Sequence, residues 1–280
     1  MNALEIRNLS KHYAGFSLEN LNLTLPWGCI MGLVGENGAG KSTTIKLILN
    51  TVSRDGGTVT VMGKDNRENL CLTKEEIGVV LDEVGISACL TARQLGKIME
   101  GVYRNWDKAV FDDYLARLAV PPDKKFKDFS RGMKMKLGIA VALSHHPRLL
   151  ILDEATSGLD PVVRDQVMDI FNEFTRDENH AILISSHIVS DLEKICDYIA
   201  FLHKGRLLLC EEKDRLKEEY GVLHCTAQEA SSIPDSAIIG KKVSPHGCEL
   251  LVKRADVPGN PAFSPVDIEQ LFIFMAKEEH

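Results

Sequence analysis

Four short stretches of this chain combine side chains that can bind and cleave a phosphate chain. In chain order they are residues 35–44, 130–133, 149–154 and His187. Backbone N–H groups in a glycine-rich turn bind phosphate oxygens, carboxylates hold Mg²⁺ or activate water, and histidine transfers protons. The residue types in these stretches therefore indicate chemistry on a phosphate chain.

The first stretch matches the pattern G-x-x-x-x-G-K-S at Gly35, Gly40, Lys41 and Ser42, and it follows the apolar run 29–34. A strand before this pattern and a helix after it form a phosphate-binding loop, because the glycines and the helix N-terminus present N–H groups to an anion. Lys41 is expected to reach the β- and γ-phosphates, and the Ser42 hydroxyl is expected to ligate Mg²⁺. The residues predicted to contact the nucleotide in this loop are Gly35, Glu36, Asn37, Gly38, Ala39, Gly40, Lys41, Ser42, Thr43 and Thr44.

An acidic pair, Asp153 and Glu154, follows the apolar run 149–152. Such a run predicts a buried strand, and α/β sheets bind their ligands at the carboxyl ends of these strands. Asp153 is expected to hold Mg²⁺ through water, and Glu154 is expected to orient and deprotonate the attacking water. An acidic pair at a strand end is often only a solvated surface feature. The spacing from Lys41 and the exit sequence 155–160 favour the catalytic interpretation here.

Together these stretches resemble the ATPase subunit of an ATP-binding cassette (ABC) transporter over roughly residues 3–220. In that family a Leu-Ser-Gly-Gly-Gln signature closes over the γ-phosphate held by a second cassette, and Ser130-Arg131-Gly132-Met133 is similar to it. The resemblance implies that Ser130, Gly132 and Met133 contact a nucleotide bound by a partner cassette. Arg131 replaces the first glycine and can add positive charge at that nucleotide.

The resemblance also implies roles for three residues outside the phosphate loop. His187 matches the switch histidine, which contacts the γ-phosphate and helps the catalytic Glu154 to hold the attacking water. Asp160 ends the loop along which two cassettes touch, and Tyr13 matches the aromatic residue that stacks on adenine. The alternatives are a structural histidine and a tyrosine that is half-buried at a strand end.

Asp82, at the end of the segment 77–82, occupies the position where the family usually has glutamine. Its carboxylate can ligate Mg²⁺ together with Ser42 and Asp153, but it donates no hydrogen bond and adds negative charge near the triphosphate. Combined with the Ser-Arg-Gly-Met signature, this aspartate makes the chain resemble cassettes of bacterial exporters of the antibiotic-resistance kind.

The elements that must position these residues are predicted from runs of apolar residues. Such runs predict strands at 4–8, 16–25, 29–34, 58–62, 149–152, 181–185, 199–202 and 249–252. Thr91 and Asp107 are predicted to cap helices, which makes residues from about 74 to 145 a helical insertion. With the resemblance, the expected fold class is α/β, a P-loop NTPase core with a parallel sheet, N-terminal antiparallel strands, a helical insertion arm and a small C-terminal β/α appendage.

Two domains follow from this pattern. Residues 1–220 are predicted to form an ABC nucleotide-binding domain, and residues 221–280 are predicted to form the small appendage. Ser264-Pro265-Val266-Asp267 is expected to start a helix with its cap. The sequence leaves open whether the appendage covers the core or forms a dimer contact.

Composition restricts the classes of protein. The chain has 280 residues, is 44% hydrophobic and carries a net charge of −7, which argues against a protein that binds nucleic acid through bulk charge. Its seven cysteines are scattered, as is typical of reduced thiols. No apolar run is long enough to cross a bilayer, so a membrane-spanning part is expected to be another polypeptide.

The sequence is thus identified as that of an ATP-hydrolysing subunit of a bacterial ABC transporter, an exporter, with ATP and Mg²⁺ as its nucleotide and metal. The expected partners are a second cassette and an integral membrane permease subunit, and no nucleic acid. The expected location is the cytoplasmic face of the cell membrane, where the membrane subunit holds the chain.

The main alternative is a soluble ABC ATPase that acts on ribosomes or DNA. The DNA-acting kind has a long coiled coil between the phosphate loop and the signature, and the interval from Lys41 to Ser130 is too short for it. The ribosome-acting kind usually has two cassettes in one chain, whereas this chain has one. A nucleotide-gated regulator that senses a ligand through residues 221–280 is a third possibility, and a P-loop kinase or GTPase leaves the signature and His187 unexplained.

Overall fold

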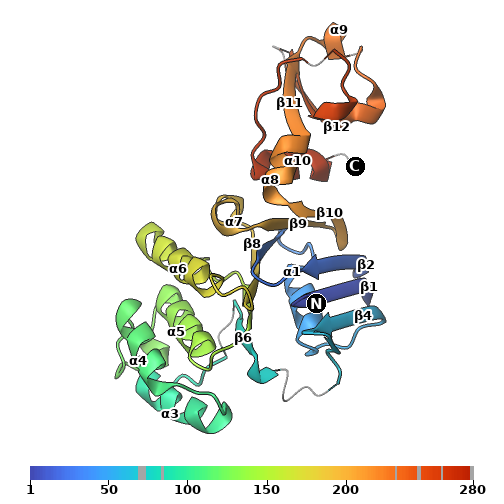
Figure 1. Cartoon of the computed structure of the whole chain (residues 1–280). Helices are drawn as coiled ribbons and strands as arrows, with labels where there is room; N and C mark the ends of the chain where they lie inside the picture. The colour runs from blue at the N-terminus through green and yellow to red at the C-terminus, as the bar shows by residue number, and fades with distance from the viewer. Residues whose placement is uncertain (69–73, 83–84, 231, 245–246, 260, 278–280) are drawn as a thin grey trace.

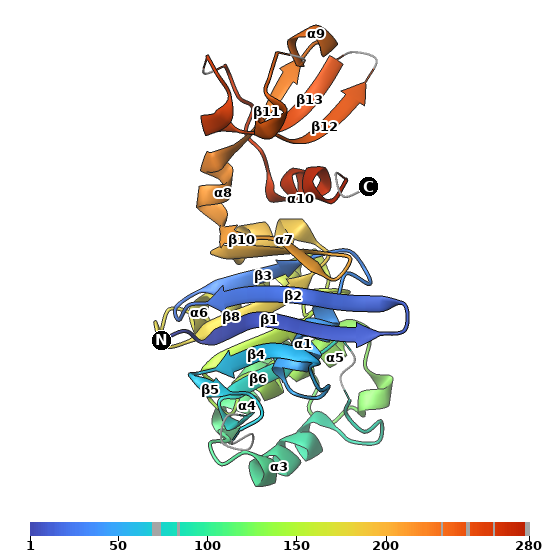
Figure 2. The same cartoon turned by 90° about the vertical axis from the view of Figure 1, so that its right-hand side faces the viewer.

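The computed structural model describes residues 1–68, 74–82, 85–230, 232–244, 247–259 and 261–277, which form three β-sheets. The helical arm and the C-terminal appendage lie at opposite ends of the molecule, with the two larger sheets between them (Figures 1 and 2). This arrangement leaves the nucleotide-binding elements in the middle of the molecule.

The six-stranded sheet has the order β10-β9-β3-β8-β7-β6. Its strands are β3 (Ile30–Val34), β6 (Ile77–Val80), β7 (Leu149–Asp153), β8 (Ala181–Ser186), β9 (Tyr198–His203) and β10 (Arg206–Glu212). All neighbouring pairs are parallel except β9 and β10, which form an antiparallel pair. The parallel sheet predicted from the apolar runs is therefore confirmed, and β10 extends it at one edge.

The second sheet is antiparallel and has four strands in the order β2-β1-β4-β5. Its strands are β1 (Leu4–Tyr13), β2 (Phe16–Leu25), β4 (Gly56–Val61) and β5 (Lys64–Asp65), and helix α1 (Lys41–Ile48) precedes β4. Leu4 pairs with Leu25 on one side and with Val61 on the other. The predicted N-terminal antiparallel strands are confirmed.

The helical arm consists of α3 (Ala92–Val102), α4 (Lys108–Arg117), the short 3₁₀ helix η1 (Phe126–Asp128) and α5 (Arg131–Leu143). Thr91 caps α3 in a capping box with Gln94, and Asp107 caps α4 through the N–H groups of Ala109 and Val110, so both predicted caps are confirmed. The arm begins later than predicted from residue 74, because β6 pairs with β7 inside the six-stranded sheet.

Helices α6 (Pro161–Phe174) and α7 (Val189–Ile195) follow β7 and β8. Both faces of the six-stranded sheet are covered, which explains its uninterrupted apolar strands. In β7, Leu150 and Leu152 belong to a buried cluster with α5 and α6, whereas Leu149 and Ile151 belong to a cluster with α1 and the four-stranded sheet.

The C-terminal appendage is built on an antiparallel sheet of three strands in the order β11-β13-β12. Helix α8 (Lys213–Glu219) connects β10 to it, and its own elements are β11 (Tyr220–Cys225), α9 (Ala227–Ala230), η2 (Asp235–Ala237), β12 (Ile238–Ser244), β13 (Gly247–Lys253), η3 (Arg254–Asp256) and α10 (Ile268–Lys277). A small cluster that includes Leu223, Leu250 and Val252 forms its own interior.

The predicted start of the last helix is wrong by three residues. Ser264 exchanges two backbone hydrogen bonds with Val222 and thereby extends the edge of the small sheet. Asp267 performs the capping instead, since its Oδ1 accepts the N–H of Gln270 at 2.6 Å and the helix begins at Ile268. A long-range backbone pairing therefore overrides the local capping signal of Ser264.

Helix α10 lies between the appendage sheet and the nucleotide-binding part of the chain (Figure 2). Its Phe272 packs against Phe201 of β9 with ring centroids 5.3 Å apart. Leu271 and Phe272 belong to the same buried cluster as residues of α5, β7 and α7. The appendage thus shares the main hydrophobic core through α10 and through Val222 of β11 and Leu251 of β13.

None of the helices in the described part of the chain combines the length and the apolar character that a membrane crossing requires.

Candidate nucleotide-binding and hydrolysis site

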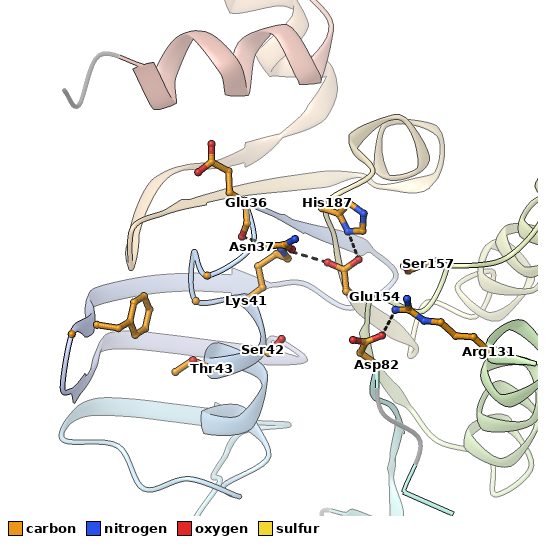
Figure 3. Close-up of a pocket in the computed structure, with 14 residues that line it drawn as sticks. Glu36, Asn37, Lys41, Ser42, Thr43, Asp82, Arg131, Glu154, Ser157 and His187 are labelled. Carbon is orange, nitrogen blue, oxygen red and sulfur yellow. Dashed lines mark hydrogen bonds and ion pairs between the residues drawn. The ribbon is translucent and has the colours of Figure 1, made fainter. Parts of the chain in front are cut away.

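A cavity of about 760 Å³ lies at the carboxyl ends of β3, β6, β7 and β8 (Figure 3). All four predicted stretches contribute to it, together with Asp82, Ser157 and the turn between β1 and β2. Its walls are formed by Gly15, Phe16, Glu36, Asn37, Gly38, Gly40, Lys41, Ser42, Thr43, Asp82, Arg131, Glu154, Ser157 and His187. This is the edge at which parallel α/β sheets bind ligands.

The phosphate loop has a backbone that only glycine accommodates at key points. Gly38 and Gly40 have φ values of 84° and 112°. A Cβ atom on Gly35 would lie 2.5 Å from the carbonyl oxygen of Leu202. The loop therefore runs close to β9 and turns directly into α1, whose first N–H groups are available to an anion.

Lys41 is buried, and its Nζ donates a 2.7 Å hydrogen bond to the carbonyl oxygen of Gly35. The same Nζ lies 3.5 Å from Oε1 of Glu154. A buried ammonium group requires such partners, because an unpaired charge is costly away from water. The Glu154 carboxylate thus neutralises the charge of Lys41.

Glu154 is the residue on which the cavity converges (Figure 3). Its Oε2 lies 2.7 Å from Nδ1 of His187, and its N–H donates to the carbonyl and hydroxyl oxygens of Ser185. The backbone of Glu154 has a φ of 54°, which is uncommon for a residue other than glycine. The carboxylate is therefore held by Lys41 and His187, while the backbone of Glu154 is held by Ser185.

Asp153 lies beneath Glu154 and is buried. Its Oδ1 accepts a 2.5 Å hydrogen bond from the hydroxyl of Ser185, which is its register partner in β8. No local pattern predicts this role for Ser185, because only the pairing of β7 with β8 brings the two residues together. Ser185 therefore connects both acidic residues to β8, the strand that precedes His187.

Ala39 and Thr44, two members of the predicted loop, serve the fold and do not line the cavity. The N–H of Ala39 donates to the carbonyl oxygen of Glu36 at 3.1 Å, which closes the loop. Thr44 is fully buried, and its hydroxyl donates to the carbonyl oxygen of Gly40 at 2.9 Å. The neighbouring hydroxyls of Ser42 and Thr43 face the cavity.

The signature residues divide into two groups. Ser130 caps α5 by accepting the N–H of Met133, and neither these two residues nor Gly132 lines the cavity of their own chain. Arg131 does line it, and its Nη2 lies 2.5 Å from Oδ1 of Asp82. Asp160 is also outside the cavity, where it caps α6 through the N–H of Val163. The placement of Arg131 in the chain's own cavity differs from the expected one.

Phe16 forms the aromatic wall of the cavity, and no sequence motif predicted this role. Its ring packs on Gly40, where an added Cβ would lie 3.0 Å from its Cζ. Tyr13 is 44% exposed and lies outside the cavity, with Nζ of Lys11 5.5 Å from its ring centre. Glu83, which the sequence places next to Asp82, lies outside the described residues.

The oxygen donors in the cavity fit a magnesium ion. Ser42 and Asp82 line the same cavity, and Asp153 lies beside Glu154 beneath it. Mg²⁺ is bound through one or two carboxylates together with waters and substrate phosphates, and these side chains offer such carboxylates.

The sequence model of the family described as "ABC transporter" matches residues 18–157 of this chain. That stretch is half of the 280 residues and contains the phosphate loop, the signature and both acidic residues. The chain belongs to the ABC transporter ATP-binding family. The predicted family is therefore confirmed.

Named relatives agree with this assignment. The bacitracin transport ATP-binding protein BcrA of Bacillus licheniformis is 35% identical over 218 residues, which cover 77% of this chain and 71% of BcrA. The lantibiotic transport ATP-binding protein SrtF of Streptococcus pyogenes is 36% identical over 215 residues, which cover 75% of this chain and 91% of SrtF.

Solved structures confirm the fold class. The structure of an ATP-binding subunit of an ABC transporter superposes with a TM-score of 0.71 at 26% identity. The alignment covers 77% of this chain and 92% of the chain in that structure. A dimeric ATP-binding cassette with ADP and phosphate has a TM-score of 0.67 at 19% identity, which shows the fold alone, over 75% of this chain and 98% of its own. This ABC cassette is an ATPase, as predicted.

Proposed function

We propose that this cassette drives a bacterial exporter, in which two cassettes bind ATP between them and a separate membrane subunit carries the cargo. The observation that carries the proposal is the contact of Glu154 with both Lys41 and His187 in one cavity. The names of the relatives, bacitracin and lantibiotic transport ATP-binding proteins, support transport as the purpose of ATP hydrolysis.

The site residues have the following proposed roles. The N–H groups of the phosphate loop bind the phosphate oxygens, and Lys41 exchanges the Glu154 carboxylate for the β- and γ-phosphates. Glu154 is then free to orient a water molecule and accept its proton, with His187 beside it. Ser42, Asp82 and Asp153 would hold Mg²⁺, which supplies neutralisation of the phosphate charge when it is bound.

The proposed second cassette provides the part that each chain lacks at its own site. Ser130, Gly132 and Met133 lie outside the cavity of their own chain, although a serine-capped helix N-terminus is well suited to a phosphate. A head-to-tail pair would bring this N-terminus to the γ-phosphate of the other chain. Asp160, at the start of α6, is proposed to lie along the contact between the two cassettes.

The proposed partner in the membrane is an integral permease subunit, which would hold the cassette at the cytoplasmic face of the cell membrane. No nucleic acid is expected as a partner. Residues 1–220 are proposed to act as the nucleotide-binding domain and residues 221–280 as an appendage to it.

A pull-down of the tagged chain from detergent-solubilised native membranes tests this function, with untagged cells as the control. We expect stoichiometric recovery of a protein with several membrane-spanning segments, identified by mass spectrometry. Recovery of ribosomes or DNA-bound proteins without such a subunit would contradict transport and support the soluble-ATPase alternative.

A further inference from the structure

Two departures from the family pattern contact each other in this structure. Asp82 stands where the family has glutamine, and Arg131 stands where it has the first glycine of the signature. The residues are 49 positions apart, yet Nη2 of Arg131 lies 2.5 Å from Oδ1 of Asp82 (Figure 3). The two departures are therefore one feature, an ion pair between the start of α5 and the end of β6.

The position of Arg131 is fixed by more than this one contact. Its side chain lies over Gly158, where an added Cβ would be 3.2 Å from Cδ of Arg131. Gly158 follows Ser157, and Ser157 lines the cavity together with Arg131 and Asp82. The guanidinium group is thereby held at the wall of the chain's own cavity.

The charges around the cavity explain why such a pair is needed. Lys41 is paired with Glu154, and among the described residues the cation that pairs with Asp82 is Arg131. An unpaired carboxylate at this wall would repel the phosphates of an incoming nucleotide, because like charges at short range destabilise each other. Arg131 cancels this repulsion and adds donors that suit phosphate oxygens.

The pair is also weak enough to open. The side chains of Arg131 and Asp82 are 58% and 46% exposed, and an exposed ion pair shifts an equilibrium by no more than about fivefold. Hydrogen bonds from a guanidinium group to phosphate are stronger than this. A nucleotide in the cavity can therefore take Arg131 from Asp82.

We propose that Arg131 binds the nucleotide of its own cassette, and that Asp82 holds Arg131 in position until the nucleotide arrives. This proposal rests on the nucleotide-binding role proposed above for the cavity. Arg131 would then contact the nucleotide of its own chain, whereas the family resemblance predicted a contact with the nucleotide of a partner cassette. Opening of the pair also releases the Asp82 carboxylate, and it removes a contact between α5 and β6.

The test is a titration of the full chain with fluorescent ATP and ADP analogues in EDTA, at a protein concentration where sedimentation shows a monomer. The variants are Arg131→Gln, Asp82→Asn and the double variant, each of which removes charge at nearly constant size. Matched controls are Arg117→Gln and Glu173→Gln. These residues form an exposed 2.9 Å ion pair between α4 and α6, away from the residues that line the cavity.

We expect the two single variants to change ATP affinity in opposite directions. Arg131→Gln should weaken binding by about tenfold, because a charged donor to phosphate is lost. Asp82→Asn should tighten it by about fivefold, because repulsion is removed and Arg131 is freed. The double variant should bind ATP more tightly than Arg131→Gln alone, because it also removes the Asp82 carboxylate that Arg131→Gln leaves unpaired.

The nucleotide gives a further check of position. Arg131 lies on the cavity wall with Glu154 and His187, so its loss should weaken ATP binding more than ADP binding. The Arg117→Gln and Glu173→Gln controls should stay within about twofold of the wild type, as exposed pairs of this kind contribute little. Thermal unfolding of each variant confirms that it is folded.

Three results would contradict the inference. One is an Arg131→Gln affinity within twofold of the wild type, and another is a loss no larger than in Arg117→Gln. The third is a loss of ATP affinity that is seen only at protein concentrations where dimers form. This result would mean that Arg131 contacts the nucleotide of the partner cassette. Failure of the wild-type chain to bind ATP would instead contradict the proposed function of the cavity.

Discussion

At the scale of single residues, Glu154 connects the parts of the site. Lys41 comes from the phosphate loop and lies near Oε1 of Glu154. His187 follows β8 and contacts Oε2 of the same carboxylate. With the proposed role of Glu154 as general base, a phosphate that attracts Lys41 would free the Glu154 carboxylate. The contact between Lys41 and Glu154 would then connect nucleotide binding to activation of the base.

Glu154→Gln tests this role directly. Glutamine keeps the size of the side chain and still accepts hydrogen bonds, but it cannot take a proton from water. We expect ATP binding to persist and phosphate release to fall by about 10²–10⁴-fold. The measurements are steady-state phosphate release and equilibrium nucleotide binding. The exposed Glu178→Gln serves as the control, and near-normal turnover in Glu154→Gln would contradict the assignment of the base.

The aromatic contact to the base of the nucleotide is a second prediction at this scale. Phe16 lines the cavity and should stack on or beside the base, so Phe16→Ala is expected to weaken ATP binding by about three- to tenfold. Tyr13 lies outside the cavity in this structure and would have to swing in. A similar loss in Tyr13→Ala, measured by the same titration, would support its proposed stacking, whereas a loss in Phe16→Ala alone would assign the stacking to Phe16.

The sequence motifs predicted the site residues that carry their own local pattern. The phosphate loop, Glu154 and His187 meet in the cavity because each follows a strand of the same parallel sheet. Ser185, Phe16 and the contact of Arg131 with Asp82 could not be predicted in the same way. Their roles depend on which strands are neighbours and on how the arm docks, and a local pattern contains neither.

At the scale of elements, caps and apolar runs located most helices and strands within a few residues. The limits that were predicted wrongly belong to elements that pair with residues far away in the sequence. Ser264 has the chemistry of a helix cap but pairs with Val222 instead, and β6 lies in the sheet although its surroundings in the sequence are helical. Tertiary pairing decided both.

The junction of the arm with the sheet contains a pH-dependent contact. His145, which follows α5, is fully buried and stacks on Tyr103 with ring centroids 3.9 Å apart. Its Nδ1 lies 3.0 Å from the carbonyl oxygen of Glu75, which precedes β6. Burial is the main cause that lowers the pKa of His145 below its ordinary value. The folded arm therefore contains a neutral histidine.

Acidification should consequently destabilise the arm. An unfolded His145 takes up a proton below its ordinary pKa of about 6.5, whereas the folded one resists it, so the unfolded state binds more protons. This stabilising contribution is present above pH 6.5 and is lost as the pH falls below it. We expect His145→Phe, which keeps the stacked ring, to lose less unfolding free energy than the wild type between pH 7.5 and 5.5. Equal losses in urea denaturation would contradict this.

At the scale of the whole molecule, the appendage and the cassette are not independent. Residues of α10 lie in one buried cluster with residues of the arm and of the six-stranded sheet, whereas the interior of the appendage sheet is small. The predicted boundary at residue 220 divides the sequence into two stretches. The main hydrophobic core, however, contains residues from both sides of that boundary. We expect the folded chain to unfold as a unit.

Phe272→Ala tests this shared core. It removes a buried ring that packs on Phe201, and such a truncation costs about 3 kcal/mol of unfolding free energy. Ile273→Ala, on the exposed side of α10, should cost well under half as much. Urea denaturation followed by far-UV and fluorescence signals should show a single shifted transition. A separate early transition of the appendage in the wild type would contradict the shared core.

The backbone of Glu154 has a consequence for how this protein can evolve. A φ of 54° costs a glutamate about 1 kcal/mol that glycine would not incur. A mutation to glycine would relax the turn, but it would also leave the buried Lys41 ammonium group without its carboxylate partner. Because an unpaired buried charge costs more free energy than a relaxed turn returns, selection for folding opposes this mutation even in a gene copy that no longer needs turnover.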